Sequence, residues 1–262
     1  MKMDIPNPVT GYSEVNGLKM YYEIHGAGKP IVLIHGGGST IDTTFGRILE
    51  KLAVNHQVIA IEMEAHGRTG NRGKPLSFES DADDVAGLMK NLDISKADIF
   101  GFSNGGTTAF QIAIRHPAVV DKMIIASAIF KKDGAPQMIW DFIRNGNLET
   151  MPQPLKDAFR AVNQNEQDLR TMFTRDQERM NTFKNIPEGA IAGIKAKTLI
   201  LAGDNDVTKP EHALEMHRLI AGSELMIIPG GHGDYMGEIT TLGNGPEAYS
   251  HVAGLIERFL SA

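Results

Sequence analysis

The sequence predicts an α/β fold in which a mostly parallel, doubly wound sheet carries an inserted helical segment. Short apolar runs that look like buried strands alternate with amphipathic stretches of helical length. Residues 131–189 interrupt this alternation, because they contain no convincing strand pattern. The glycine-rich stretch GFSNGG at 101–106 lies between an apolar run and a helical pattern. Alternation of this kind is typical of a parallel sheet covered by helices on both faces.

The bulk properties are those of a globular chain and exclude several classes of function. A length of 262 residues fits one large α/β domain with an insertion, or two small domains. A net charge of −6 argues against nucleic acid or an anionic membrane surface as a partner. The absence of cysteine excludes disulfides, thiol chemistry and thiolate metal sites. No apolar run approaches the length of a membrane span, and the N-terminal residues lack the apolar core of a signal peptide, so a cytoplasmic location is expected.

The first half of the chain is predicted to hold six short strands and three helices. The strands are expected at 12–15, 18–24, 30–34, 57–63, 97–100 and 122–128, and the helices at 45–52, 80–92 and 107–115. Asn16-Gly17 joins the first two strands and is a strong signal for a two-residue hairpin. Acidic residues in the first turn of the helix at 80–92 suit the helix dipole.

The second half begins with the interruption and then returns to the α/β pattern. Residues 131–189 mix methionine and aromatic residues with polar residues and prolines, so we interpret them as a helical insertion. Residues 1–130 and 190–262 are then the two parts of one core. In the second part we expect strands at 198–202 and 224–228, a helix at 211–220, and a last helix from about 246 to 260 with Pro246 at its first position.

Ser103 is the candidate nucleophile. A G-x-S-x-G sequence between a strand and a helix predicts a nucleophile elbow, a sharp turn that holds the serine in a strained conformation with its Oγ exposed. Glycines two residues before and two residues after the serine leave room for the neighbouring strand and helix. The alternative is an ordinary strand-to-helix turn in which Ser103 caps the helix.

A serine hydroxyl is a weak nucleophile at neutral pH and needs a base, for which His232 is the best candidate. It follows a predicted strand in a glycine-rich loop, so it should project at the carboxyl edge of the sheet. The other histidines are interpreted as ordinary residues. His35 would order its loop, His66 occupies a turn, His116 ends a helix, and His25, His56, His212, His217 and His251 look like surface or helix-face residues.

The base needs a carboxylate to orient it and to stabilise the imidazolium. Asp204 and Asp206 both follow the strand at 198–202, and Asp206 is favoured because Asp204 is better placed to shape the turn. Asp133 and Asp234 are weaker choices.

Two backbone N–H groups are expected to stabilise an oxyanion. One belongs to Asn104, directly after the nucleophile, and the other to the loop at 35–38, where Gly37 is favoured. The alternative for this loop is a phosphate cradle, but the sequence lacks both the P-loop and the dinucleotide-binding patterns.

The order Ser103, Asp206, His232, preceded by a His-Gly loop, resembles the α/β-hydrolase fold family over nearly the whole chain. The resemblance supports Asp206 through the Gly203, Asp206, Pro210 spacing, and it places the insertion where the family has a cap over the active site. One departure is in residues 62–69, EMEAHGRT, where relatives often have Asp-x-Arg-Gly-His-Gly-x-Ser. A second is the long glycine-rich segment at 233–245.

These features predict a serine hydrolase that cleaves a small, largely apolar ester, thioester or lactone through an acyl-enzyme, with no metal or organic cofactor. The resemblance also admits perhydrolysis or carbon–carbon bond hydrolysis on the same residues, and a slow-turnover ligand-binding receptor. A serine at 103 argues against haloalkane dehalogenases and epoxide hydrolases, which use a carboxylate nucleophile. The expected partner is a small-molecule substrate, with oligomeric state left open.

Overall fold

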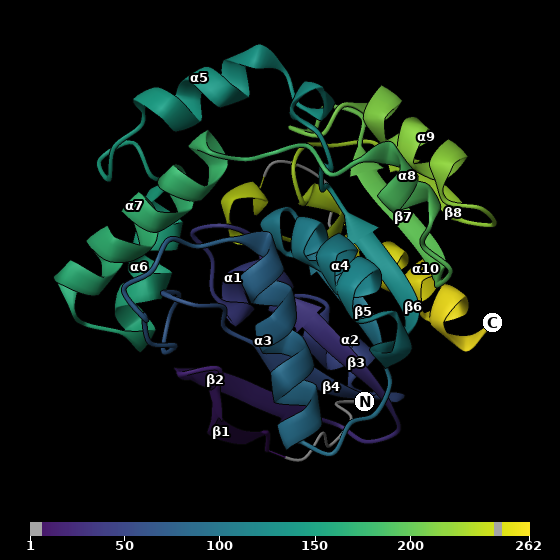
Figure 1. Ribbon diagram of the computed structural model, residues 1–262, viewed down its shortest axis with the longest axis horizontal. Helices are drawn as coiled ribbons and strands as arrows, with labels where there is room; N and C mark the ends of the chain where they lie inside the picture. Colours follow the sequence, from purple (N-terminus) through teal and green to yellow (C-terminus); the bar gives the residue numbers. More distant parts are fainter. Residues whose placement is uncertain (1–6, 244–247) are drawn as a thin grey trace.

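The computed structural model describes residues 7–243 and 248–262, and its centre is an eight-stranded sheet. The strand order is β1-β2-β4-β3-β5-β6-β7-β8. β1 and β2 form an antiparallel hairpin, β2 pairs antiparallel with β4, and all later pairings are parallel. Figure 1 shows this sheet with helices on both sides. The predicted fold class is confirmed.

The strands agree closely with the sequence prediction. They are β1 Val9–Val15, β2 Leu18–His25, β3 Lys29–Ile34, β4 His56–Ile61, β5 Ala97–Phe102, β6 Val120–Ala126, β7 Lys197–Gly203 and β8 Glu224–Ile228. Asn16 and Gly17 both have positive φ in the hairpin, as the Asn-Gly signal predicts.

The helices differ from the prediction mainly at their ends. They are α1 Ile41–Phe45, α2 Leu49–Leu52, α3 Phe78–Asn91, α4 Asn104–Arg115, α5 Gln137–Asn145, α6 Gln153–Val162, α7 Glu166–Asn181, α8 Glu188–Ala192, α9 Pro210–Leu219 and α10 Tyr249–Ser261. The single helix expected at 45–52 is wrong: a turn separates α1 from α2. The predicted position of Pro246 lies outside the described residues.

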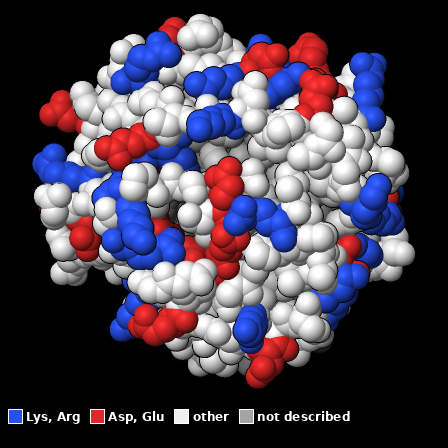
Figure 2. Space-filling view, viewed as in Figure 1, with Lys and Arg blue, Asp and Glu red and all other residues white. Residues whose placement is uncertain are grey.

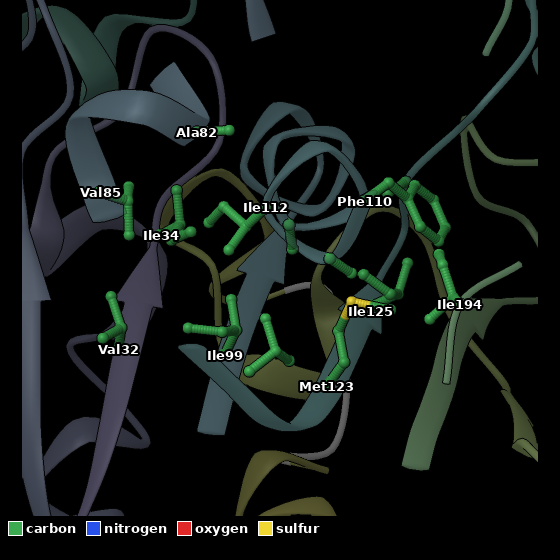
Figure 3. Close-up of a cluster of buried hydrophobic side chains, with 14 of the residues drawn as sticks. Val32, Ile34, Ala82, Val85, Ile99, Phe110, Ile112, Met123, Ile125 and Ile194 are labelled. Atoms are coloured by element: carbon green, nitrogen blue, oxygen red, sulfur yellow. The ribbon is translucent and has the colours of Figure 1, made fainter. Parts of the chain in front are cut away.

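Alternate side chains of the central strands enter two separate cores. On one face, Val32 and Ile34 of β3, Ile99 of β5 and Ile125 of β6 pack with residues of α3, α4, α8 and α9. Figure 3 shows this packing, with Val85 and Ile112 projecting from the helices toward the strands. Burying each such aliphatic side chain contributes about 1.5–3 kcal/mol.

The opposite face of the sheet has a core of its own. Leu33, Phe100 and Leu201 pack there with residues of α1, α2 and α10. Because both faces are buried, the central strands read as continuous apolar runs rather than as alternating patterns. The two cores hold the carboxyl ends of β3, β5, β6, β7 and β8 at one edge of the sheet.

Residues 131–189, which we call the helical insertion, contain helices α5 to α7 and the first two residues of α8, and no strand. In Figure 1, α5, α6 and α7 are grouped at one side of the sheet. The insertion has two small apolar clusters, one around Trp140 and Phe183 and one around Phe159 and Met172. The cluster at Trp140 also includes Phe78 of α3, so part of the insertion packs on the core.

The surface carries charges of both signs. Figure 2 shows Lys and Arg interspersed with Asp and Glu over the visible face. Within the described part of the chain, no helix is both long enough and apolar enough to cross a lipid bilayer.

Candidate active site

Ser103 occupies a sharp turn between β5 and α4. Its φ of 54° and ψ of −121° are strained for a residue with a side chain. The close approaches around it explain the flanking glycines: a Cβ at Gly101 would lie 2.2 Å from the Gly105 oxygen, and one at Gly105 would lie 2.1 Å from the Ile34 oxygen. Ser103 begins α4 without a side-chain capping hydrogen bond, so its Oγ is not used as a helix cap.

The structure brings Ser103, His232 and Asp206 into one hydrogen-bonded row. His232 Nε2 lies 3.1 Å from Ser103 Oγ, and His232 Nδ1 lies 2.6 Å from Asp206 Oδ1. The ring of His232 also packs against Phe102, with centroids 4.7 Å apart. If Nδ1 donates to the carboxylate, Nε2 is left to accept the Ser103 proton.

Asp206 is held as an acceptor by its neighbours. Burial opposes ionisation, but the charge and hydrogen bond of His232, with further hydrogen bonds from Ser127 and the Gly203 N–H, bring the pKa of Asp206 below its usual value. Ser127 Oγ donates to Asp206 Oδ2 and therefore accepts from the hydroxyl of Tyr235, 2.6 Å away. Burial and the Asp206 charge raise the pKa of Tyr235, so this hydroxyl keeps its proton.

The other acidic candidates make different contacts. Asp204 Oδ1 accepts the Gly230 N–H at 2.8 Å, so it joins its turn to the loop after β8 rather than shaping its own turn as expected. Asp234 accepts the Gly231 N–H within its own loop. The Asp133 side chain is 73% exposed. Of the four acids weighed from the sequence, Asp206 is the one that contacts His232.

The loop at 35–38 and the start of α4 present free backbone donors. Among the described residues, the N–H groups of Gly37 and Asn104 have no hydrogen-bond acceptor. Both residues line the same cavity as Ser103. A Cβ at Gly37 would come within 2.5 Å of the side-chain Nδ2 of Asn104, so the loop lies close to the first residue of α4. This is the arrangement expected of an oxyanion site.

His35 orders the 35–38 loop, as the sequence suggested. Its Nδ1 donates to the Gly36 oxygen at 2.7 Å, and its Nε2 accepts the Met63 N–H at 3.1 Å. Burial, with a contribution from the nearby His66, lowers the pKa of His35 to about 3. His35 is therefore neutral, with its proton on Nδ1.

The unusual acids of residues 62–69 pair with arginines of the same region. Glu62 accepts the Arg68 N–H at 2.6 Å and Nη1 at 2.7 Å. Glu64 accepts the Arg72 N–H at 2.7 Å and Nε at 2.9 Å. The two acids thus fold this loop onto itself, and neither contacts Ser103, Asp206 or His232.

A cavity of about 390 Å³ opens in front of Ser103. The sheet edge supplies Gly37, Ser103, Asn104 and His232, and the insertion supplies most of the apolar wall. That wall includes Ile139, Trp140, Phe142, Ile143, Leu155, Phe173 and Met180. One carboxylate of the insertion, Asp176 of α7, also lines the cavity.

Sequence reasoning missed several polar residues around this site. His66, interpreted as a turn residue, is buried and lies 2.9 Å from Asp176 Oδ2. His56, interpreted as a surface or helix-face residue, is buried in β4, so that interpretation was wrong; His212 does lie on a helix, α9, but its side chain is buried. Ser127 could have been found, since it follows β6 at the edge that carries Ser103. Asp176 gave no signal, because it lies on an amphipathic helix far along the chain.

Comparison with known proteins identifies the family. The family model described as alpha/beta hydrolase fold matches residues 29–192, more than half of the chain. The human protein named serine hydrolase BPHL is 31% identical over 235 residues, covering 83% of this chain and 77% of that protein. The chain belongs to the α/β-hydrolase family. This family is one of hydrolase enzymes.

Solved structures agree with this α/β hydrolase in fold. The 2-hydroxy-6-oxo-6-phenylhexa-2,4-dienoate hydrolase from Rhodococcus sp. strain RHA1 superimposes with a TM-score of 0.80 at 18% identity, covering 98% of this chain and 99% of that one. An N-acyl homoserine lactone degrading enzyme gives a TM-score of 0.76 at 25% identity, covering 95% of this chain and 99% of that one. Within the described residues, no group of three or more His, Asp or Glu is placed to hold a metal ion.

Proposed function

We propose that this α/β hydrolase is a serine hydrolase that cleaves small, largely apolar and uncharged esters, thioesters or lactones. The observation that carries the proposal is the row of Ser103, His232 and Asp206, which opens on a cavity beside two unpaired N–H groups. Nucleophile, base, orienting acid and oxyanion donors are the parts that acyl transfer requires.

In the first half-reaction, Ser103 Oγ attacks the carbonyl carbon and its proton passes to His232 Nε2. Asp206 stabilises the imidazolium that forms, and the carbonyl oxygen, now negative, accepts from the N–H groups of Gly37 and Asn104. Each such donor contributes about 3–4 kcal/mol of transition-state stabilisation. His232 then gives its proton to the leaving oxygen or sulfur, the bond to the leaving group breaks, and the acyl-enzyme remains.

In the second half-reaction, His232 takes a proton from a water molecule as that water attacks the acyl carbon. The same N–H groups stabilise the second oxyanion. The ester bond to Ser103 breaks, His232 returns the proton to Ser103 Oγ, and the carboxylic acid leaves. Over the two half-reactions, the only molecules consumed are the substrate and one water molecule.

The cavity wall favours an uncharged substrate. The lining residues include neither Lys nor Arg, and their single carboxylate, Asp176, is already bonded to the Gly38 N–H, His66 and Arg179. A dienoate, which the Rhodococcus neighbour is named for, carries a carboxylate that would lose its hydration here without gaining a cation. The N-acyl homoserine lactone in the other neighbour's name carries no charge at its ester group. We therefore place ester or lactone hydrolysis ahead of carbon–carbon bond hydrolysis.

We further propose that the helical insertion, residues 131–189, acts as a cap that selects the substrate. The insertion contributes most of the apolar lining, much of it from α5 and α7, whereas the reacting groups come from residues 1–130 and 190–262. Substrate size and shape would then depend on the insertion and reactivity on the sheet edge.

The test is covalent labelling with a small fluorophosphonate, read by intact-protein mass spectrometry. Wild type should gain one adduct, Ser103→Ala should gain none, and Ser95→Ala, which changes an exposed serine, should label like wild type. A panel of uncharged esters, a lactone, a dienoate and a peracid-forming assay would then identify the reaction. An unlabelled wild type that binds ligand tightly would instead favour a receptor.

A further inference from the structure

A buried ionic cluster lies between the helical insertion and the core. It consists of His66 in the loop after β4, Asp81 on α3, and Asp176 and Arg179 on α7. Arg179 Nη1 donates to Asp81 Oδ2 at 2.7 Å, and Arg179 Nη2 donates to Asp176. All four residues are at most 9% exposed. The catalytic steps described above use none of them.

The contacts of His66 with two oxygen atoms favour the charged imidazolium. Its Nδ1 lies 2.9 Å from the Glu64 carbonyl oxygen, and its Nε2 lies 2.9 Å from Asp176 Oδ2. Because both oxygens act as acceptors, these two contacts are satisfied when both ring nitrogens carry a proton. Burial opposes this charge, but Asp176 outweighs burial and raises the pKa of His66 above its usual value.

The two acids of the cluster are balanced by its two cations. Burial disfavours the Asp176 carboxylate, yet the charges of His66 and Arg179 bring its pKa well below the usual value. Burial raises the pKa of Asp81 to about 6 against the opposing effect of Arg179. A lone carboxylate here would repel the negative charge of an oxyanion, whereas a neutralised cluster leaves that charge unopposed.

Asp176 also bonds directly to the loop that carries the proposed oxyanion donor. The Gly38 N–H lies 2.6 Å from Asp176 Oδ2 and 3.2 Å from His66 Nε2. The carboxylate is nearer and charged, so it is the better acceptor. Gly38 has a φ of +67°, and a Cβ on Gly37 would lie 3.1 Å from the same Oδ2. The carboxylate thus anchors the peptide between Gly37 and Gly38, next to the Gly36–Gly37 peptide that carries the Gly37 N–H and whose oxygen bonds His35.

We propose that Asp176 is a positioning residue: it bonds the Gly38 N–H and thereby holds the Gly37 N–H toward the reacting carbonyl oxygen, so that the oxyanion site is complete only when the helical insertion is seated. The inference rests on the proposed function, in which Gly37 is an oxyanion donor. His66, Asp81 and Arg179 hold the Asp176 carboxylate in place and offset its charge. The insertion then contributes to the rate as well as to substrate selection.

The experiment compares Asp176→Ala, Asp176→Asn and a matched control, Glu178→Ala, which removes an exposed acid two residues along the same helix. Two rates are measured: phosphonylation of Ser103 by the small fluorophosphonate, whose phosphoryl oxygen occupies the oxyanion position, and turnover of 4-nitrophenyl butyrate. Asp176→Ala should lower both the phosphonylation rate and kcat about 10–100-fold, with KM within about twofold.

Asp176→Asn keeps an acceptor oxygen for the Gly38 N–H, so its phosphonylation rate and kcat should be at least about tenfold higher than those of Asp176→Ala. Glu178→Ala should match wild type in both. A merely structural role would lower the active fraction without this rescue. A loss seen in KM alone would make Asp176 a pocket-shaping residue and overturn the proposal, as would Asp176→Ala rates equal to those of wild type.

A second measurement uses wild type alone, so the proposal can be tested even if Asp176→Ala does not fold. In wild type, the Gly38 amide proton should exchange slowly with solvent and resonate far downfield, as expected for a short bond to a carboxylate. Fast exchange at Gly38 would overturn the proposal without any variant. If wild-type Ser103 is not phosphonylated at all, the proposed function fails; if it is phosphonylated and Asp176→Ala reacts equally fast, only this inference fails.

Discussion

The sheet edge around Ser103 and the helical insertion opposite it are built in different ways. At the sheet edge, backbone segments approach so closely that side chains cannot be added at Gly101 or Gly105. The insertion is made of amphipathic helices, and α5 leaves Met138 72% and Phe142 57% exposed. The reacting groups therefore occupy a part of the molecule that tolerates little change, while the apolar wall occupies a part that can be altered.

Polar groups follow the same division, with one exception. At the sheet edge, Asp206, His232, Ser127 and Tyr235 form a continuous chain of hydrogen bonds. Most of the insertion's lining is apolar and depends on contact alone. The exception is Asp176, which carries the polar chemistry of the insertion into the 35–38 loop. Through this bond the insertion contacts the loop beside Ser103 directly.

The largest expected effect comes from removing the charge of Asp206. Asp206→Asn should lower kcat for an ester substrate about 10⁴-fold, because the amide cannot orient and stabilise the His232 imidazolium as a carboxylate does. Steady-state kinetics on the folded variant measure this. Asp133→Asn, a change at an exposed acid, is the control and should stay within about twofold of wild type. Activity retained by Asp206→Asn would mean that another acid orients His232.

A second, smaller effect compares added methyl groups in the two regions. Gly105→Ala places a Cβ 2.1 Å from the Ile34 oxygen, so it should destabilise the fold by about 3 kcal/mol or more. Gly189→Ala, in α8 of the insertion, meets nothing within 4 Å and should stabilise by about 0.5–1 kcal/mol. Urea denaturation of both variants gives the two values. Equal destabilisation would remove the proposed difference in tolerance between the regions.

The same difference decides how much the sequence could predict. Ser103 and His232 follow strands, and strand ends of a parallel sheet meet at one edge, so local patterns were enough to place them together. The sequence has no local pattern that predicts the turn between α1 and α2, because Phe45 and Leu49 are both buried and the apolar spacing continues across it. The contact of His66 with Asp176 joins residues 110 positions apart and depends on how the insertion packs. No local pattern carries that information.

The smallest effect is expected at the mouth of the cavity, where Phe142 both lines the wall and reaches solvent. Phe142→Ala should lower kcat/KM for 4-nitrophenyl esters of long acyl chains about 5–10-fold, because apolar contact is lost, and leave the acetate ester unchanged. Met138→Ala, one turn earlier on α5 and outside the lining, is the matched control and should not change either ester. A chain-length dependence that Phe142→Ala leaves intact would place the acyl group elsewhere in the cavity. An equal loss on both esters would mean that α5 affects the reacting groups, and the division between a reactive sheet edge and a selective wall would no longer hold.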